Sequence, residues 1–118
     1  YQRHSVVYTG SHDNDTSAGW YATADSRTQD HVRRYMMCDG SDISWTMIRT
    51  VLASVPELAV IPLQDIMSLG TEARMNFPGR AEGNWQWRYL PEQLRDEIAA
   101  RLGALTELYG RAPAAPRR

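Results

Sequence analysis

The sequence has very little cysteine. Cys38 is the single cysteine in 118 residues, so no disulfide bond can form within the chain. A lone cysteine is typical of a reducing compartment, and we expect a cytoplasmic location. Cys38 follows Met36 and Met37 in a stretch that reads as helical, which predicts a buried, unreactive thiol.

Long apolar runs, basic runs and a leader segment are also missing. No stretch reaches the roughly 18 apolar residues of a membrane span. The net charge of −1 and the lack of a basic run argue against a nucleic-acid partner. The chain begins at Tyr1, without a signal peptide or an initiating methionine, and enters a strand-like segment almost at once. We therefore expect that it was cut from a larger protein.

What is present is an ordinary globular composition, with 42% hydrophobic and 23% charged residues. Residues 5–9 and 58–63 are short, mainly apolar and rich in residues that favour strands. A polar loop follows each segment. We expect two strands of a parallel α/β sheet, buried on both faces, because such strands are nearly all apolar.

Helical patterns fill most of the remaining chain. Asp15 or Thr16 is a good N-cap for a helix starting near Ser17, and a second helix is expected over residues 26–37. Apolar residues recur at helical spacing from Ile43 to a point before Pro56. A long final helix is expected from the apolar face of residues 90–108, opened by Pro91 and closed by Gly110. Residues 112–118 read as a disordered Ala/Pro tail.

The first candidate site is the run TGSHDNDT at residues 9–16, directly after the first strand. In parallel α/β folds, side chains at the carboxyl ends of strands line the active site. An adjacent His12 and Asp13 could bind neighbouring sugar hydroxyls, and the carboxylate could stabilise an oxocarbenium-like transition state. Two alternatives remain open, a helix-capping cluster and a metal site, although zinc would need more His or Cys ligands.

The second candidate site follows the second strand and interleaves amides, charges, glycines and aromatics over residues 62–88. Amides read sugar hydroxyls and aromatic faces pack on sugar rings, so this composition suits an oligosaccharide. We expect Asn76 to contact a ligand. Trp85 and Trp87 are expected to be core anchors. The charged side chains expected to form structural ion pairs are Glu72, Arg74 and Arg80.

Together the two regions resemble the 4-α-glucanotransferases of the amylomaltase type, glycoside hydrolase family 77 of the α-amylase clan. Residues 8–16 with Gly19-Trp20 resemble the segment after that family's seventh barrel strand. The pieces that resemble the eighth-strand region are PLQD at 62–65, EARMN at 72–76, PGR at 78–80 and GNW at 83–85. The resemblance spans residues 6–88 in order. It departs at Ser11, where many relatives have threonine, and this change keeps the hydroxyl.

The resemblance implies a retaining enzyme that transfers a segment of an α-1,4-glucan to the 4-hydroxyl of glucose or another maltodextrin. By resemblance, Asp13 is the transition-state stabiliser of the clan, His12 binds the same sugar and Asn76 contacts the next sugar along the donor chain. The implied partners are α-1,4-glucans, maltooligosaccharides and glucose. No cofactor and no metal are implied.

The resemblance also implies that parts of the catalytic machinery lie elsewhere. The family places its nucleophile and its acid/base carboxylate on the fourth and fifth strands of a (β/α)8 barrel, which takes about 250 residues. We therefore expect residues 1–111 to be the C-terminal part of such a barrel, from the seventh strand to the final helix, and to be inactive alone. The alternatives are a non-catalytic maltodextrin-binding module and an α-glucan hydrolase of the same clan.

Overall fold

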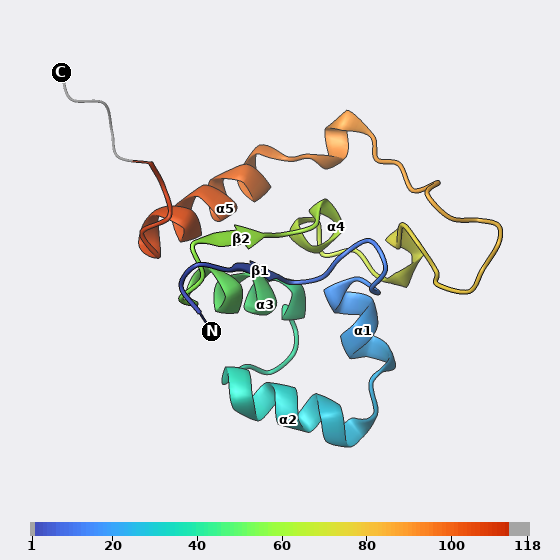
Figure 1. Ribbon diagram of the computed structural model, residues 1–118, viewed down its shortest axis with the longest axis horizontal. Helices are drawn as coiled ribbons and strands as arrows, with labels where there is room; N and C mark the ends of the chain where they lie inside the picture. The colour runs from blue at the N-terminus through green and yellow to red at the C-terminus, as the bar shows by residue number, and fades with distance from the viewer. Residues whose placement is uncertain (1, 114–118) are drawn as a thin grey trace.

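The structure is a computed structural model that describes residues 2–113 and combines helices with a small parallel sheet (Figure 1). The strands are β1 (Val6–Tyr8) and β2 (Leu58–Val60). The α-helices are α1 (Ser17–Thr23), α2 (Ser26–Met36), α3 (Ile43–Leu52), α4 (Leu63–Ile66) and α5 (Asp96–Leu108). Two short 3-10 turns, η1 (Thr71–Ala73) and η2 (Pro91–Gln93), lie between α4 and α5.

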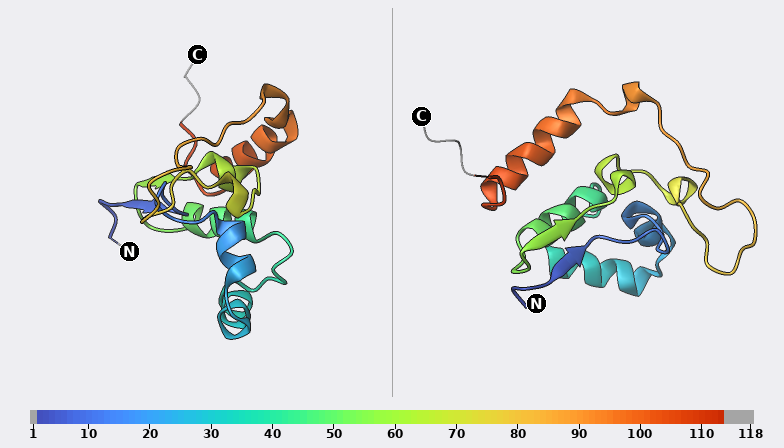
Figure 2. Two further views of the ribbon diagram at one scale, coloured as in Figure 1. Left: turned by 90° about the vertical axis from the view of Figure 1, so that its right-hand side faces the viewer. Right: turned by 45° about the horizontal axis from the view of Figure 1, so that its top comes forward.

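The two strands pair in parallel, with Val7 opposite Ala59. Parallel strands need a long crossover, and α1, α2 and α3 supply it. The carboxyl ends of both strands therefore lie at the same edge. The long loop after η1 projects beyond this edge (Figure 2). The expected parallel α/β arrangement is confirmed, and both polar loops begin at one edge of the sheet.

The expectation that both faces of the strands are covered is wrong for the described residues. Val7 is 6% exposed, and its ladder partner Ala59 packs against the core cluster of α3. Side chains alternate along a strand, so Val6 and Tyr8 point to the opposite face, where Tyr8 is 55% exposed. Within residues 2–113, helices cover only one face of the sheet.

The core is built on α3 and is completed by α5. Trp45, Ile48 and Leu52 repeat at helical spacing and form the buried cluster. The α5 side chains packed against this cluster are Ile98, Leu102 and Leu105. The helix α3 ends at Leu52, before Pro56 as expected, since proline disfavours helical backbone in the residue before it.

Arg111 joins the end of the chain after α5 to the turn before β2. Its guanidinium donates hydrogen bonds to the backbone carbonyls of Leu52, Ser54, Pro56 and Glu57 at 2.8–3.2 Å. Leu52 is the last residue of α3, so its carbonyl has no partner within the helix, and the other three carbonyls lie in the turn that leads to β2. One side chain therefore satisfies the C-terminal end of α3 and fixes the entry to β2.

The final helix is divided, although one long helix was expected. The turn η2 holds residues 91–93, and the backbone then leaves helical geometry at Leu94, with φ −85° and ψ 80°. The Gln93 side chain accepts a hydrogen bond from Leu90 N–H, which closes this turn on itself. A new helix, α5, starts at Asp96 and ends before Gly110, which has φ +70° as its closing role requires.

Two smaller expectations concern Cys38 and the tail. Cys38 is part-exposed and lies beyond α2, so the prediction of a buried thiol in a helix is wrong. The helix stops because Met37 takes a left-handed conformation at its C-cap. Of the expected tail, residues 114–118 lie outside the described residues. Across residues 2–113, no helix is long and apolar enough to cross a membrane.

Candidate functional site

The site is formed by two loops at the carboxyl edge of the sheet. The first loop, residues 10–16, follows β1, and the second loop, residues 67–90, follows α4. Asp65 of α4 is 1% exposed and accepts hydrogen bonds from Thr9 Oγ1 at 2.6 Å, Ser17 N–H at 2.8 Å and Ser17 Oγ at 2.9 Å. Thr9 and Ser17 flank the first loop, so one buried carboxylate holds both of its ends.

Within the first loop, the residues after Asp13 shape the backbone. Asn14 Oδ1 accepts hydrogen bonds from Ser11 N–H at 2.9 Å and Ser11 Oγ at 3.0 Å. Asp15 accepts from Thr16 N–H at 2.8 Å. Thr16 is the N-cap of α1 and accepts from Gly19 N–H at 3.0 Å, which confirms the expected start of that helix. Asn14, Asp15 and Thr16 therefore have the capping role that was one of the alternatives for this loop.

A second contact of Asp15 explains the glycine in α1. Thr71 Oγ1 donates to Asp15 Oδ2 at 3.0 Å, which ties η1 to the first loop. A Cβ atom at Gly19 would clash with both Asp15 and Thr71. Only glycine lets α1 approach this hydrogen bond so closely. The Gly19-Trp20 pair noticed in the sequence is thus a packing requirement at its first residue.

The carboxylate of Asp13 contacts His12 and the second loop while much of the side chain stays in solvent. The Asp13 side chain is 54% exposed, and His12 Nε2 lies 3.3 Å from Asp13 Oδ2. Asn76 Nδ2 donates to Asp13 Oδ1 at 2.6 Å, although the two residues are 63 positions apart. The structure thus brings together His12, Asp13 and Asn76. Their roles toward a sugar stay predictions.

Arg74 reinforces this meeting point through backbone carbonyls. Its Nη2 donates to Asp13 O at 3.0 Å and its Nε donates to Asn76 O at 2.9 Å. One planar guanidinium therefore links the two residues whose side chains are themselves hydrogen-bonded. No pattern in the sequence indicates this contact, because it depends on how the two loops meet.

The expected ion pairs of the second loop are not found among the described residues. Instead, the guanidiniums of Arg74 and Arg80 lie over the Phe77 ring, 4.6 and 4.1 Å from its centroid. Glu72 accepts a hydrogen bond from Gly70 N–H at 3.1 Å. Cation–π contacts and local hydrogen bonds therefore shape the loop where ion pairing was expected.

The two tryptophans of the second loop were expected to be core anchors, and this expectation is wrong. Trp85 is 52% exposed, and its ring lies 4.9 Å from the His12 ring, centroid to centroid, at a 41° tilt. Trp87 is part-exposed and lies 5.8 Å from the Tyr89 ring. Neither ring belongs to the core cluster built on α3 or to the apolar side chains packed against it.

Two features of the site were missed in the sequence. Residues 63–66 form the short helix α4 where a polar loop was expected, and Asp65 in this helix was not among the expected site residues. Its position directly after an apolar strand and next to Gln64 was the available signal. Only burial identifies it as the anchor of the first loop.

A small cavity lies between the two loops, with a volume of about 140 Å³. Its lining includes His12, Asn14, Asp65 and Arg74. Pockets that enclose small ligands usually measure about 300–1,000 Å³, so this cavity does not enclose an oligosaccharide. In residues 2–113 there is also no group of three or more His, Cys, Asp or Glu side chains that could hold a metal ion. The candidate site is therefore an open surface with exposed polar groups, His12 and Asp13 among them.

Comparison with known proteins identifies the family. A family model described as 4-alpha-glucanotransferase matches residues 1–93. The chain is 50% identical over 108 residues to a 4-alpha-glucanotransferase of Synechocystis sp., covering 91% of this chain and 21% of that protein. It is 47% identical to a 4-alpha-glucanotransferase of Thermus thermophilus, covering 86% of this chain and 22% of that protein.

A solved structure is also similar. The amylomaltase from Streptococcus agalactiae, determined in complex with acarbose, matches with a TM-score of 0.91 at 31% identity, over 96% of this chain and 23% of that chain. The chain belongs to the 4-alpha-glucanotransferase family, glycoside hydrolase family 77. The resemblance seen in the sequence is confirmed. The chain spans about a fifth of the length of the relatives that it matches.

Proposed function

We propose that this chain forms part of a 4-α-glucanotransferase and supplies the sugar-gripping side of its active site. The enzyme transfers a segment of an α-1,4-glucan to the 4-hydroxyl of glucose or another maltodextrin, with retention of configuration. The observation that carries the proposal is the exposed carboxylate of Asp13, held between His12 and Asn76 at the carboxyl edge of a parallel sheet.

The carboxylate of Asp13 is suited to two tasks. A carboxylate offers about four acceptor sites. The contact with His12 uses one site on Oδ2, and the hydrogen bond from Asn76 uses one site on Oδ1. The remaining lone pairs are free to accept hydrogen bonds from two neighbouring hydroxyls of one sugar ring. The same negative charge stabilises the positive charge that develops at the anomeric carbon in the oxocarbenium-like transition state.

His12 and Asn76 complete the grip. The imidazole of His12 is 54% exposed beside the carboxylate, so it can bind a hydroxyl of the same sugar. The amide of Asn76 keeps its oxygen and a second N–H for the next sugar along the donor chain. The partners in this proposal are α-1,4-glucans, maltooligosaccharides and glucose, and the reaction uses no metal or cofactor. The single cysteine supports a cytoplasmic location.

The same proposal places residues 1–111 at the C-terminal end of a (β/α)8 barrel, with β1 and β2 as its seventh and eighth strands, and 112–118 as a tail. The apolar face that carries Val6, Tyr8 and Leu58 supports this placement, because barrel strands turn bulky apolar side chains into a packed interior. The nucleophile and the acid/base carboxylate, which must lie about 5–5.5 Å apart in a retaining enzyme, belong to earlier strands.

Product analysis with maltotriose tests the proposal. The full-length protein that carries this sequence is expected to yield both longer and shorter glucans, whereas residues 1–118 alone are expected to yield neither. Release of glucose and maltose alone would identify a hydrolase. Binding of maltotriose without turnover would identify a sugar-binding module. Turnover by residues 1–118 alone would show that the missing carboxylates are not needed.

A further inference from the structure

Trp85 has a backbone conformation that is rare for its residue type. Its φ angle is +60°, in the left-handed region. Among the described residues, only Met37 and Ser68 share a positive φ without being glycine. A side chain as large as tryptophan crowds the backbone in this region, so the conformation costs free energy unless the surroundings impose it.

Hydrogen bonds on both sides of Trp85 impose this conformation. Trp85 N–H donates to Met75 O at 2.6 Å, and Trp85 O accepts from Arg88 Nη1 at 3.2 Å. The preceding side chain, Asn84, accepts from Phe77 N–H at 2.8 Å and donates to Arg80 O at 2.9 Å. The second loop is therefore bound to itself immediately before and at the strained residue.

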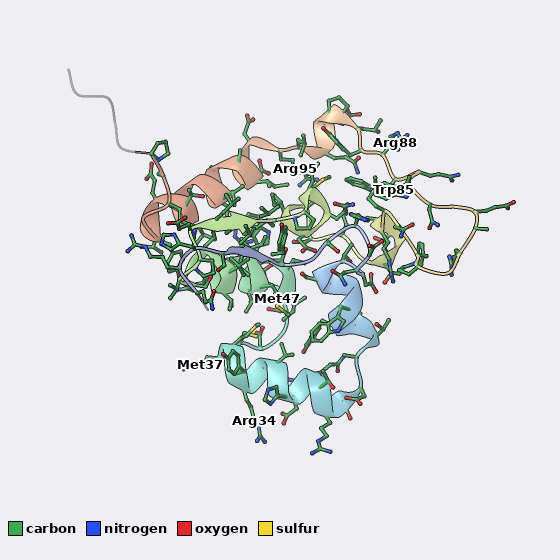
Figure 3. All side chains as sticks on the ribbon, in the orientation of Figure 1. Arg34, Met37, Met47, Trp85, Arg88 and Arg95 are labelled. Atoms are coloured by element: carbon green, nitrogen blue, oxygen red, sulfur yellow. The ribbon has the colours of Figure 1, made fainter. Side chains whose placement is uncertain are left out.

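Burial does not account for the strained conformation. Trp85 is 52% exposed, so most of the free energy that a tryptophan gains by burial is not realised here. What the conformation does achieve is a ring contact with His12, at 4.9 Å between centroids. Figure 3 shows Trp85 on the second loop, beside the segment that follows β1.

His12 needs such a contact to hold one orientation. Its imidazole is half-exposed, and Asp13 is its one ion-pair neighbour within residues 2–113. Asp13 Oδ2 lies 3.3 Å from His12 Nε2, which is long for a hydrogen bond. The ring torsion of histidine is soft and has a broad energy minimum. A flat aromatic ring packed against the imidazole narrows that minimum.

We propose that Trp85 is a positioning residue whose indole fixes the plane of the His12 imidazole, so that Nε2 stays directed at Asp13. The strained backbone of Trp85 is the means by which the second loop delivers this ring. This inference rests on the proposed function and deepens it, since it adds a residue that acts on the sugar only through His12.

Substitution of Trp85 by glycine tests whether the indole positions His12 or only stabilises the fold. In the full-length protein, W85G removes the ring and also relieves the positive φ, whereas W85F keeps an aromatic ring. M37G is the matched control, since Met37 has φ +53°, is 92% exposed and is not part of the site. Both glycine variants are expected to keep a thermal unfolding midpoint no lower than that of the parent.

Only W85G is expected to lose activity. Its kcat/KM for maltotriose disproportionation should fall by roughly two- to tenfold, the range of one aromatic contact, while W85F retains most of it and M37G all of it. A lower unfolding midpoint in W85G with a maintained midpoint in M37G would show that Trp85 is structural and would overturn the proposal.

A double-mutant cycle with H12A tests the route of the effect. If Trp85 acts through His12, W85G causes no further loss of kcat/KM in the H12A background. Independent, additive losses would mean that the indole binds the sugar directly, and the proposal would be wrong. The result of this cycle does not depend on the unfolding midpoints of W85G and M37G.

A readout without substrate keeps the inference distinct from the proposed function. The ring-proton NMR signals of His12, assigned by their loss in H12A, should shift in W85G because the indole ring current is removed. They should stay unchanged in M37G. Absence of turnover in the parent protein would reject the transferase function, whereas an unchanged His12 signal in W85G would reject the positioning contact.

Discussion

The two loops at the carboxyl edge of the sheet differ in what they contribute. The first loop, residues 10–16, carries His12 and Asp13, and the hydrogen bonds made by its other side chains are mostly local. The second loop, residues 67–90, reaches across to the first through Thr71, Arg74 and Asn76. The short loop holds the groups proposed to act on the sugar, and the long loop determines where they lie.

The two aspartates of the region make the same contrast at the level of single residues. Asp65 is 1% exposed, and both of its carboxylate oxygens accept hydrogen bonds, three in all, from Thr9 and Ser17. Asp13 is half-exposed and keeps free lone pairs. A buried, satisfied carboxylate stabilises a fold, whereas an exposed and oriented one is available to a ligand. Substitutions should therefore separate stability from activity.

The largest expected effect comes from Asp13→Asn. Loss of the negative charge at the proposed transition-state site should lower kcat/KM for maltotriose by a factor on the order of 10³ in the full-length protein. The free energy of unfolding should change by less than about 0.5 kcal/mol, because the side chain is exposed. Asp39→Asn, at an exposed turn remote from the site, is the control. Activity within threefold of the parent would remove Asp13 from the mechanism.

Asp65→Asn should show the reverse pattern. An amide cannot accept all of the hydrogen bonds from Thr9 and Ser17, so the free energy of unfolding should fall by about 2–3 kcal/mol. Urea denaturation measures this change. Activity measured well below the unfolding transition should fall less than in Asp13→Asn. An unchanged unfolding free energy would contradict the role of Asp65 as the anchor of the first loop.

Asn76→Ala tests the contact between the loops. Removal of the amide that donates to Asp13 Oδ1 should lower kcat/KM by about tenfold, the size of one hydrogen bond to a charged group at a part-exposed site. Gln86→Ala, which removes an exposed amide from the same loop, should leave activity unchanged. Equal losses in the two variants would mean that Asn76 contributes nothing specific.

The smallest effect is expected at Asp25, outside both loops. Asp25 caps α2, and its pKa is lowered from 3.8 mainly by the backbone hydrogen bond from Thr28 N–H. A lowered folded-state pKa means that the stabilisation is present above 3.8 and is lost as the pH falls through the lower, folded-state value. Asp25→Ala should therefore lower the melting temperature at pH 7, and this difference should shrink in acid. A melting-temperature difference that stays the same from pH 7 into acid would show that the charge of Asp25 does not contribute to stability.

Local signals predicted the fold better than they predicted the site. Thr16 caps α1 as its residue type indicates, and the two apolar segments pair in parallel. The prediction of a single final helix was wrong because the Gln93 side chain accepts a hydrogen bond from Leu90 N–H and closes a separate turn. The periodicity of apolar residues does not detect such a contact.

The composition of the two loops singled out the candidate site residues and the resemblance assigned their roles, but neither predicted their contacts. Arg74 and Asn76 meet Asp13 across more than sixty positions, and a single sequence carries no record of such pairing. The exposure of Trp85 was missed for a related reason. Whether an aromatic residue is buried depends on what lies beneath its loop, which only the tertiary structure reveals.

The hydrogen bonds of Arg111 have a consequence for engineering the protein. Because this side chain binds the carbonyls of Leu52, Ser54 and Pro56, the segment directly after α5 is an integral part of the fold. If the chain were cut before Arg111 to attach a fusion partner or affinity tag, the hydrogen bonds that hold the turn before β2 would be lost. An attachment point after residue 113 leaves these hydrogen bonds in place.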